Sequence, residues 1–304
     1  MSGPLSACIG MPARVGAVAA VTFTQLVRMR LFLVPAVVAV LFLLLQFIPY
    51  QESISVEFQG VAQLQFLKDI SLGCMQLFGL IFCVAATSLL LPRDTEDRIL
   101  YTILCKPVPR FDYLAGKVLG VLALLCLMVG LLDGLMCLLL HLRETSLCNN
   151  LTAALTANGY SAEEIQPYLA QVHEAGNSWN MQRGIAAGLL GYAVLTSLTM
   201  LLSSVTSGSI VSMIFALGAY FIGMFRSTLT DMLPGEPGTG TLGQWAEHIV
   251  SILLPDFSLF AVTDTAAAGA PVSGGLLLQL ALLAAGYMLF HLLTATWIFN
   301  RKEF

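Results

Sequence analysis

The chain has 304 residues, of which 57% are hydrophobic and only 11% are charged. An ordinary soluble domain carries about 25% charged residues, and it could not bury this much apolar surface. The formal net charge of -4 gives no support to nucleic-acid binding. Composition therefore excludes an ordinary soluble domain and indicates that lipid is the solvent for most of the chain.

The apolar residues form long blocks of the length that a helix needs to cross a hydrocarbon core about 30 Å thick. These blocks predict an all-α integral membrane protein with six transmembrane helices. The predicted spans are Leu31–Ile48, Ile70–Leu91, Leu114–Leu140, Gly184–Val205, Ser209–Phe225 and Leu276–Phe299. Residues 31–304 therefore form the six-span domain, and residues 1–30 precede it.

The stretch Met11–Arg30 mixes small apolar residues with Arg14, Gln25 and Arg28. This pattern predicts a helix that lies in the membrane interface with its cationic tips towards the lipid headgroups. A disordered tail is the alternative.

The distribution of lysine and arginine sets the orientation. If the N-terminus is inside, ten basic residues lie on the inner side and four on the outer side, a bias that the positive-inside rule favours. The inner ones are Arg14, Arg28, Arg30, Arg93, Arg98, Lys106, Arg110, Lys117, Arg301 and Lys302, and the outer ones are Lys68, Arg143, Arg183 and Arg226. We therefore expect a multi-pass protein of the plasma (inner) membrane with both termini in the cytoplasm.

Two connections outside the spans have recognisable features. The extracytoplasmic loop, residues 142–182, contains Ser161-Ala-Glu-Glu, which is typical of a capping box and predicts a short helix to about Ala175. Before the sixth span, Trp245–Leu254 is too short to cross alone, and Leu254-Pro-Asp-Phe follows as a turn signal. A re-entrant segment on one face of the membrane is expected there.

The segment between the second and third spans, residues 92–112, concentrates charge of both signs. Thr95 could cap a helix that begins at Glu96 and must end before Pro107. One face of that helix is apolar, because Leu100 and Leu104 lie four residues apart. The alternative is a short amphipathic helix that lies on the bilayer surface. An anionic leaflet would repel its acidic residues, so a protein partner explains these residues better.

Three features together resemble the ABC-2 type permeases, the transmembrane subunits of one class of ATP-binding-cassette exporters. Residues 96–117, with the core Lys106-Pro-Val-Pro-Arg110, resemble the family's cytoplasmic coupling-helix region, and Met11–Arg30 resembles its elbow helix. The order of Leu254-Pro-Asp-Phe, a last span and the ending Phe299–Phe304 is similar to its C-terminal third. The chain departs from the family pattern at Ile99, where members commonly have threonine, and in its longer outer loop.

The resemblance implies that the coupling helix sits in a groove of a separate nucleotide-binding ATPase subunit and that the permease works as a dimer, with itself or with a similar second chain. The apolar residues of the coupling helix would pack against the nucleotide-binding subunit, and its charged residues would orient the helix through ion pairs with that subunit. The coupling residues expected from this resemblance are Asp94, Glu96, Asp97, Arg98, Leu100, Ile103, Leu104, Lys106, Pro107 and Arg110.

The sequence offers no catalytic constellation. It has no Walker A pattern, so ATP and magnesium are expected on the partner ATPase and no cofactor in this chain. The four histidines are dispersed, and we expect them at span ends or in outer loops. The seven cysteines lack metal-ligand spacing, which predicts neither a metal site nor disulfides.

Asp133 is the one acidic residue well inside a predicted span, where a charge costs about 2.5–3.5 kcal/mol. It could face a translocation path or pair with a neighbouring helix, or it could approach the outer interface and be hydrated. In the fourth span, Gly184-x-x-x-Gly188 is interpreted as a close-packing motif. The function expected is export of a substrate; the alternative is a non-transporting subunit that transmits ATP-driven motion to an extracytoplasmic partner.

Overall fold

The computed structural model describes residues 4–29, 37, 40–41, 56–96, 109–206, 208–226, 254–267 and 269–301, which are helical with short connections and contain no strand. Most of the predicted first span, Leu31–Ile48, and most of the segment Trp245–Leu254 lie outside these residues. The elements are α1 (Pro4–Arg28), α3 (Val56–Glu96), α5 (Arg110–Ala157), α6 (Ala162–Ala175), α7 (Trp179–Val205), α8 (Ser209–Met224), the 3-10 helix η1 (Phe257–Phe260), α11 (Thr263–Ala267) and α12 (Gly274–Arg301).

Among the described residues, four helical stretches are long and apolar enough to cross a membrane: Leu64–Asp94, Arg110–Ala157, Ala162–Val205 and Gly274–Arg301. The 16-residue α8 is also apolar but shorter. The chain is therefore an α-helical membrane protein. Helices α7, α8 and α12 closely match the predicted fourth, fifth and sixth spans.

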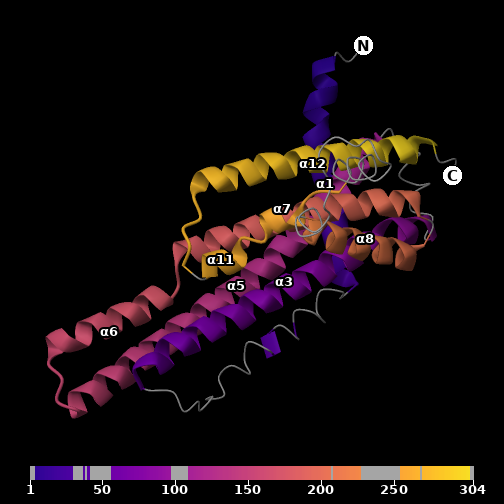
Figure 1. Ribbon diagram of the computed structural model, residues 1–304. Helices are drawn as coiled ribbons and strands as arrows, with labels where there is room; N and C mark the ends of the chain where they lie inside the picture. The colour runs from indigo at the N-terminus through magenta and orange to yellow at the C-terminus, as the bar shows by residue number, and fades with distance from the viewer. Residues whose placement is uncertain are drawn as a thin grey trace, which may run out of the picture.

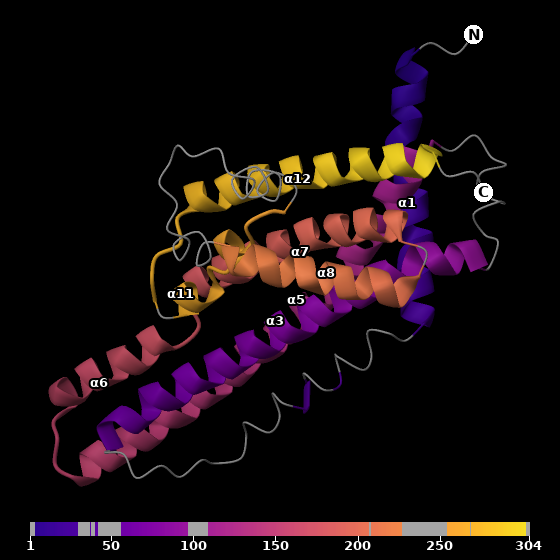
Figure 2. The same cartoon turned by 45° about the vertical axis from the view of Figure 1, so that its right-hand side comes forward.

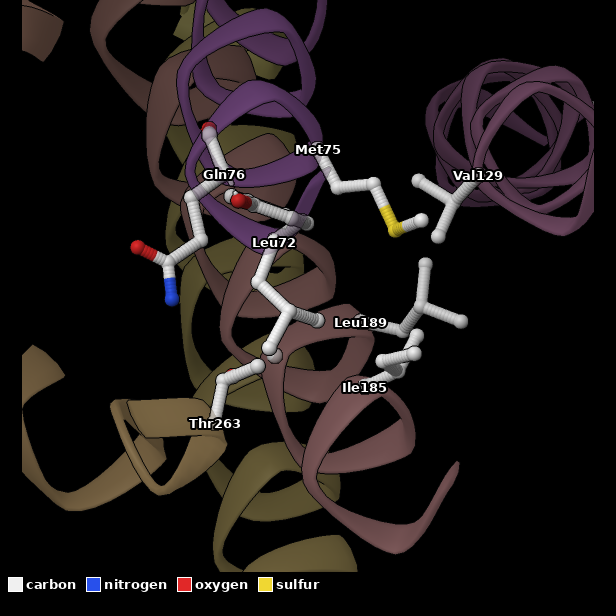
Figure 3. A pocket seen from close by; sticks show the side chains of 9 residues that line it. Leu72, Met75, Gln76, Val129, Ile185, Leu189 and Thr263 are labelled. Atoms are coloured by element: carbon white, nitrogen blue, oxygen red, sulfur yellow. Dashed lines mark hydrogen bonds between the residues drawn. The ribbon is translucent and has the colours of Figure 1, made fainter. Parts of the chain in front are cut away.

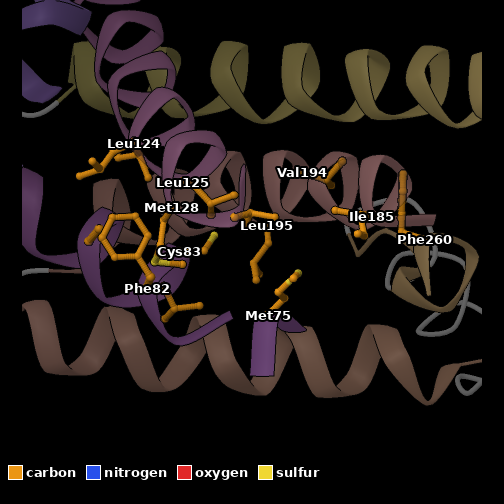
Figure 4. Close-up of a cluster of buried hydrophobic side chains, with 14 of the residues drawn as sticks. Met75, Phe82, Cys83, Leu124, Leu125, Met128, Ile185, Val194, Leu195 and Phe260 are labelled. Atoms are coloured by element: carbon orange, nitrogen blue, oxygen red, sulfur yellow. The ribbon is translucent and has the colours of Figure 1, made fainter. Parts of the chain in front are cut away.

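The core forms where α3, α5 and α7 meet (Figure 4). Phe82 and Cys83 of α3 pack there with Leu125 and Met128 of α5 and with Leu195 of α7, and all five are at most 3% exposed. The outward faces of the long helices keep apolar side chains, such as Leu131 at 68% and Leu282 at 67% exposure. Such exposure fits lipid on the outside of the bundle.

Helices α3 and α5 are longer than a membrane requires. They contain 41 and 48 residues, which at 1.5 Å per residue gives about 60 and 70 Å against a hydrocarbon core of about 30 Å. In Figures 1 and 2, the start of α3, the end of α5 and the whole of α6 extend together past α7, α8 and α12. We call this extension, residues 56–63 and 141–175, the protrusion.

The protrusion corrects the predicted outer loop. The third span was expected to end at Leu140, but α5 continues unbroken to Ala157, because Leu151 and Leu155 bury their side chains against Ile165 of α6. The predicted short helix is confirmed: α6 follows Ser161 and ends at Ala175, and the Ser161 backbone N–H donates to Glu164 Oε2 at 2.8 Å. Most of residues 142–182, which were predicted to form a loop, thus form a hairpin of two helices, the end of α5 and α6.

The segment before α12 packs inside the bundle as η1 and α11, neither of which is long enough to cross a membrane. Both contact α7. A Cβ added to Gly184 would lie 2.9 Å from Ala266 Cβ, and one added to Gly191 would lie 2.9 Å from Phe260 Cβ. The prediction that Gly184 is a close-packing position is confirmed, and its neighbour is α11 of the same chain.

Candidate functional site

The candidate site is a group of charged and polar side chains where one end of α3 meets the start of α5. We call it the polar junction, and its members come from four helices: Arg14 and Gln25 of α1, Asp94 of α3, Arg110, Asp112, Tyr113 and Lys117 of α5, and Phe299 of α12. The α3 and α5 members of the junction lie before and after residues 97–108 in the chain. These residues form the middle of the predicted coupling segment and lie outside the described residues.

Asp94 is the centre of the junction. Its carboxylate forms an ion pair with the Lys117 ammonium and accepts a hydrogen bond from the Tyr113 hydroxyl, and its Oδ1 also accepts from Gln25 Nε2 at 3.4 Å. Asp94 is 1% exposed, Lys117 3% and Tyr113 4%. A buried ion pair needs such additional hydrogen bonds, because desolvating two charges costs several kcal/mol per ion.

Two further residue pairs of the junction are Arg14 with Asp112 and Arg110 with Phe299. Arg14 Nε of α1 lies 2.8 Å from Oδ2 of Asp112, which is 3% exposed. Arg110, the first residue of α5, donates through a guanidinium NH to the Phe299 backbone carbonyl of α12, with its guanidinium carbon 5.6 Å from the centroid of the Phe299 ring. The Phe299 ring in turn stacks on Tyr113, with centroids 6.4 Å apart.

Two glycines of α5 allow the backbone of α1 to pack closely against α5 at the junction. Helix α1 crosses the end of the bundle and runs crosswise to α12 (Figures 1 and 2). A Cβ on Gly116 of α5 would lie 2.6 Å from Val18 Cβ, and a Cβ on Gly120 would lie 2.8 Å from the Ala19 carbonyl oxygen. The pair Gly116-x-x-x-Gly120 therefore forms the groove in which α1 lies.

The structure places the predicted coupling residues as follows. Asp94 and Arg110 contact other parts of this chain in the junction, and Glu96 is the last residue of α3, with its side chain outside the described part. The remaining seven lie outside the described residues: Asp97, Arg98, Leu100, Ile103, Leu104, Lys106 and Pro107.

Two expectations need correction here. Asp94 was expected to pair with a partner protein, but its carboxylate is buried against Lys117 and Tyr113. Thr95 was expected to cap a new helix, but α3 runs through Pro92 and Thr95 to Glu96. Because α3 ends at Glu96 and α5 begins at Arg110, the connection between these helices is shorter than the predicted segment 92–112.

Asp133 lies in α5 and is partly buried. Its Oδ1 accepts a hydrogen bond from Gln182 Nε2 of α7 at 2.9 Å, and the Cys137 thiol lies 3.7 Å from the same oxygen. Of the alternatives for this residue, pairing with a neighbouring helix is the one that the contacts bear out.

One histidine lies in a different environment from the one predicted. His291 was expected at a span end, but it is fully buried inside α12, with its Nδ1 3.0 Å from Ser197 Oγ of α7. The pair joins two helices that pack closely on each other. It is a polar contact inside the bundle rather than an interfacial one.

The chain matches no protein-family model, and no curated protein shows significant sequence similarity to it.

Proposed function

We propose that this chain is the transmembrane permease subunit of an ABC exporter, in which residues 97–108 receive motion from a separate nucleotide-binding ATPase. The observation that supports this most is the buried ion pair between Asp94 and Lys117, which fastens both ends of that segment to one point. A force applied to the segment would therefore reach α3 and α5 together.

The remaining junction contacts extend that path. Through Gln25 and Arg14 the junction is bonded to α1, and through Arg110 it is bonded to the end of α12. Four helices would then move as a unit instead of the segment flexing alone. A lever of this kind needs rigid attachment at its base, and the buried contacts supply it.

The positions of exposed tryptophans support the membrane placement. Trp179, at the start of α7, is 73% exposed, and Trp297, near the end of α12, is 56% exposed with the Arg301 guanidinium carbon 4.1 Å from its ring centroid. Tryptophan is enriched at both membrane–water interfaces, and arginine is enriched on the cytoplasmic side. We place the junction on the cytoplasmic side and the protrusion outside, with both termini in the cytoplasm of a plasma (inner) membrane.

Copurification with the ATPase tests the proposal. The tagged chain is extracted in mild detergent, and ATP hydrolysis by retained protein is measured for wild type, Glu96→Lys and Arg98→Glu, with transport by the same proteins measured in vesicles. Both charge reversals should reduce retained ATPase activity or uncouple it from transport. Glu163→Lys, an exposed charge reversal on α6 at the other end of the molecule, is the matched control. Equal, fully coupled activity in all four proteins would contradict the assignment.

A second function is favoured by the protrusion. Because α3 and α5 run unbroken from the junction into the protrusion, motion at the junction could be delivered to a partner outside the membrane without moving a substrate. Transport in vesicles that contain the ATPase separates the two proposals. Substrate accumulation that persists when residues 150–170 are replaced by a short linker would favour export.

A further inference from the structure

Helix α6 of the protrusion contacts α5 near both of its own ends. Near its start, Ile165 packs on Leu151 and Leu155 of α5. Near its end, close to the start of α7, His173 contacts Glu144 of α5. The first contact is apolar and does not depend on pH, whereas the second joins two groups that can gain or lose a proton.

The contact between His173 and Glu144 is close, and its two sides differ in exposure. His173 Nδ1 lies 2.5 Å from Glu144 Oε1, and the side chain of His173 is 66% exposed against 17% for Glu144. The imidazole can therefore exchange protons with water directly. The carboxylate that it faces is mostly buried.

Glu144 reaches the end of α6 because Gly176 has no side chain. A Cβ added to Gly176, the residue that follows the last turn of α6, would lie 2.6 Å from Glu144 Oε2. The carboxylate thus lies against the C-terminal end of a helix, which carries a partial negative charge and favours a cation. A protonated His173 compensates both the carboxylate and the helix end, and a neutral His173 compensates neither.

The other titratable and charged groups around this pair come from all three helices of the protrusion. They are Lys68 and Asp69 of α3, His141, Arg143 and Cys148 of α5, and Glu174 of α6. Lysine, arginine and the carboxylates keep their charge between about pH 5.5 and about pH 7.5, and a thiol stays neutral there. Histidine is the side chain whose charge changes in that interval, so His141 serves as the control for His173.

From this geometry we propose that His173 and Glu144 form a pH-sensitive latch, in which the imidazolium fastens the end of α6 to α5 and the neutral imidazole releases it. The attraction is fully present where a free imidazole is already protonated. It is lost as the pH rises and the imidazole in the pair gives up its proton. In the orientation proposed above, the latch faces the extracytoplasmic side, but the pH response itself does not rest on the proposed function.

The helices beside the protrusion are closely packed and give α6 a firm base. The pocket between α3, α5 and α7, lined by Met75, Val129 and Ile185 among others, has room for about one water molecule (Figure 3). The latch is therefore expected to change how α6 is held, and to leave the packing of α7 as it is.

Hydrogen exchange tests the latch in the whole chain, reconstituted in phosphatidylcholine nanodiscs without ATPase, at about pH 5.5 and about pH 7.5. Protection factors, which correct for the pH dependence of intrinsic exchange, are compared for residues 169–177 and for α7. In the wild type, protection of residues 169–177 should fall about three- to tenfold at the higher pH, the combined effect of one exposed ion pair and one helix-end charge. Protection in α7 should not change.

Variants separate the charge at position 173 from the side chain that carries it. His173→Gln and Glu144→Gln should each abolish the pH dependence. His173→Lys keeps a positive charge at both pH values, so protection should be high at both. His141→Gln removes the other histidine of the protrusion and should respond to pH as the wild type does.

The latch is overturned if wild-type protection is the same at both pH values, if His173→Gln keeps the wild-type response, or if His141→Gln abolishes it. The wild-type comparison needs no variant, so it decides the question even where a variant fails to fold. Because no ATPase is present, any of these results leaves the permease proposal standing. Conversely, a missing ATPase partner would leave the latch intact.

Discussion

Asp94 near the end of α3 and Lys117 in the second turn of α5 form an ion pair that is almost completely buried. Removing one member leaves the other as an uncompensated buried charge, which costs about 3–5 kcal/mol. We expect Asp94→Asn and Lys117→Met each to lower the free energy of unfolding by that amount, measured by thermal or denaturant unfolding in detergent. The double variant should lose less than the sum of the two. Additive losses would show that the two charges do not interact.

The Tyr113 hydroxyl donates to the same carboxylate. Tyr113→Phe removes that hydrogen bond but keeps the ring that stacks on Phe299. We expect a smaller loss of about 1.5–3 kcal/mol, the range for a hydrogen bond to a charged group. The same unfolding measurement checks it, and a loss as large as that of Asp94→Asn would contradict the ranking.

Gly116 sets how closely α1 approaches α5. In Gly116→Ala the new Cβ would lie 2.6 Å from Val18 Cβ and 2.9 Å from the Val15 carbonyl oxygen, so α1 must shift, at a cost of about 1–3 kcal/mol. Limited proteolysis should then cleave α1 faster. Gly130→Ala on the same helix, where nothing lies within 4 Å of the added Cβ, is the matched control and should behave as wild type. Equal cleavage in both variants would refute the docking groove.

The helical hairpin of the protrusion depends on the start of α6. Glu164→Ala removes the carboxylate that accepts from the Ser161 backbone N–H, and loss of a cap interaction costs about 0.5–2 kcal/mol. Hydrogen exchange should accelerate across residues 161–168 and stay unchanged in α7. Glu163→Ala, one residue away in the same exposed turn, should leave exchange unchanged. Faster exchange in both variants would mean that the carboxylate of Glu164 has no special role.

Four of the predicted spans fall within long apolar helices of the described residues, because lipid imposes long apolar stretches, and α12 follows the hydropathy closely. The continuation of α5 to Ala157 was missed because Leu151 and Leu155 are spaced among polar residues, and their partner Ile165 is known only once the hairpin is folded. A helix that packs against another helix through a few apolar residues set among polar ones has no hydropathy signal of a span.

The junction was missed for a related reason. The charged residues of the segment 92–112 were expected to face a protein partner, and Gln25 and Asp94 are 69 positions apart, so nothing local shows that they meet. The sequence does carry one local signal of this contact, because Gly116-x-x-x-Gly120 is a small-residue motif that is typical of a close helix contact. Contacts between buried side chains that are far apart in the sequence are the feature that local sequence patterns predict least well.

Site-specific photo-crosslinking tests the central claim most directly, that residues 97–108 contact a nucleotide-binding ATPase. A photoreactive phenylalanine analogue is placed at Ile103, in the segment, or at Glu163, on α6 of the protrusion. After illumination of native membranes, the adduct is identified by mass spectrometry. The account predicts an ATP-binding protein attached at position 103 and none at 163. An ATPase attached only at 163, or no ATPase at either position, would contradict it.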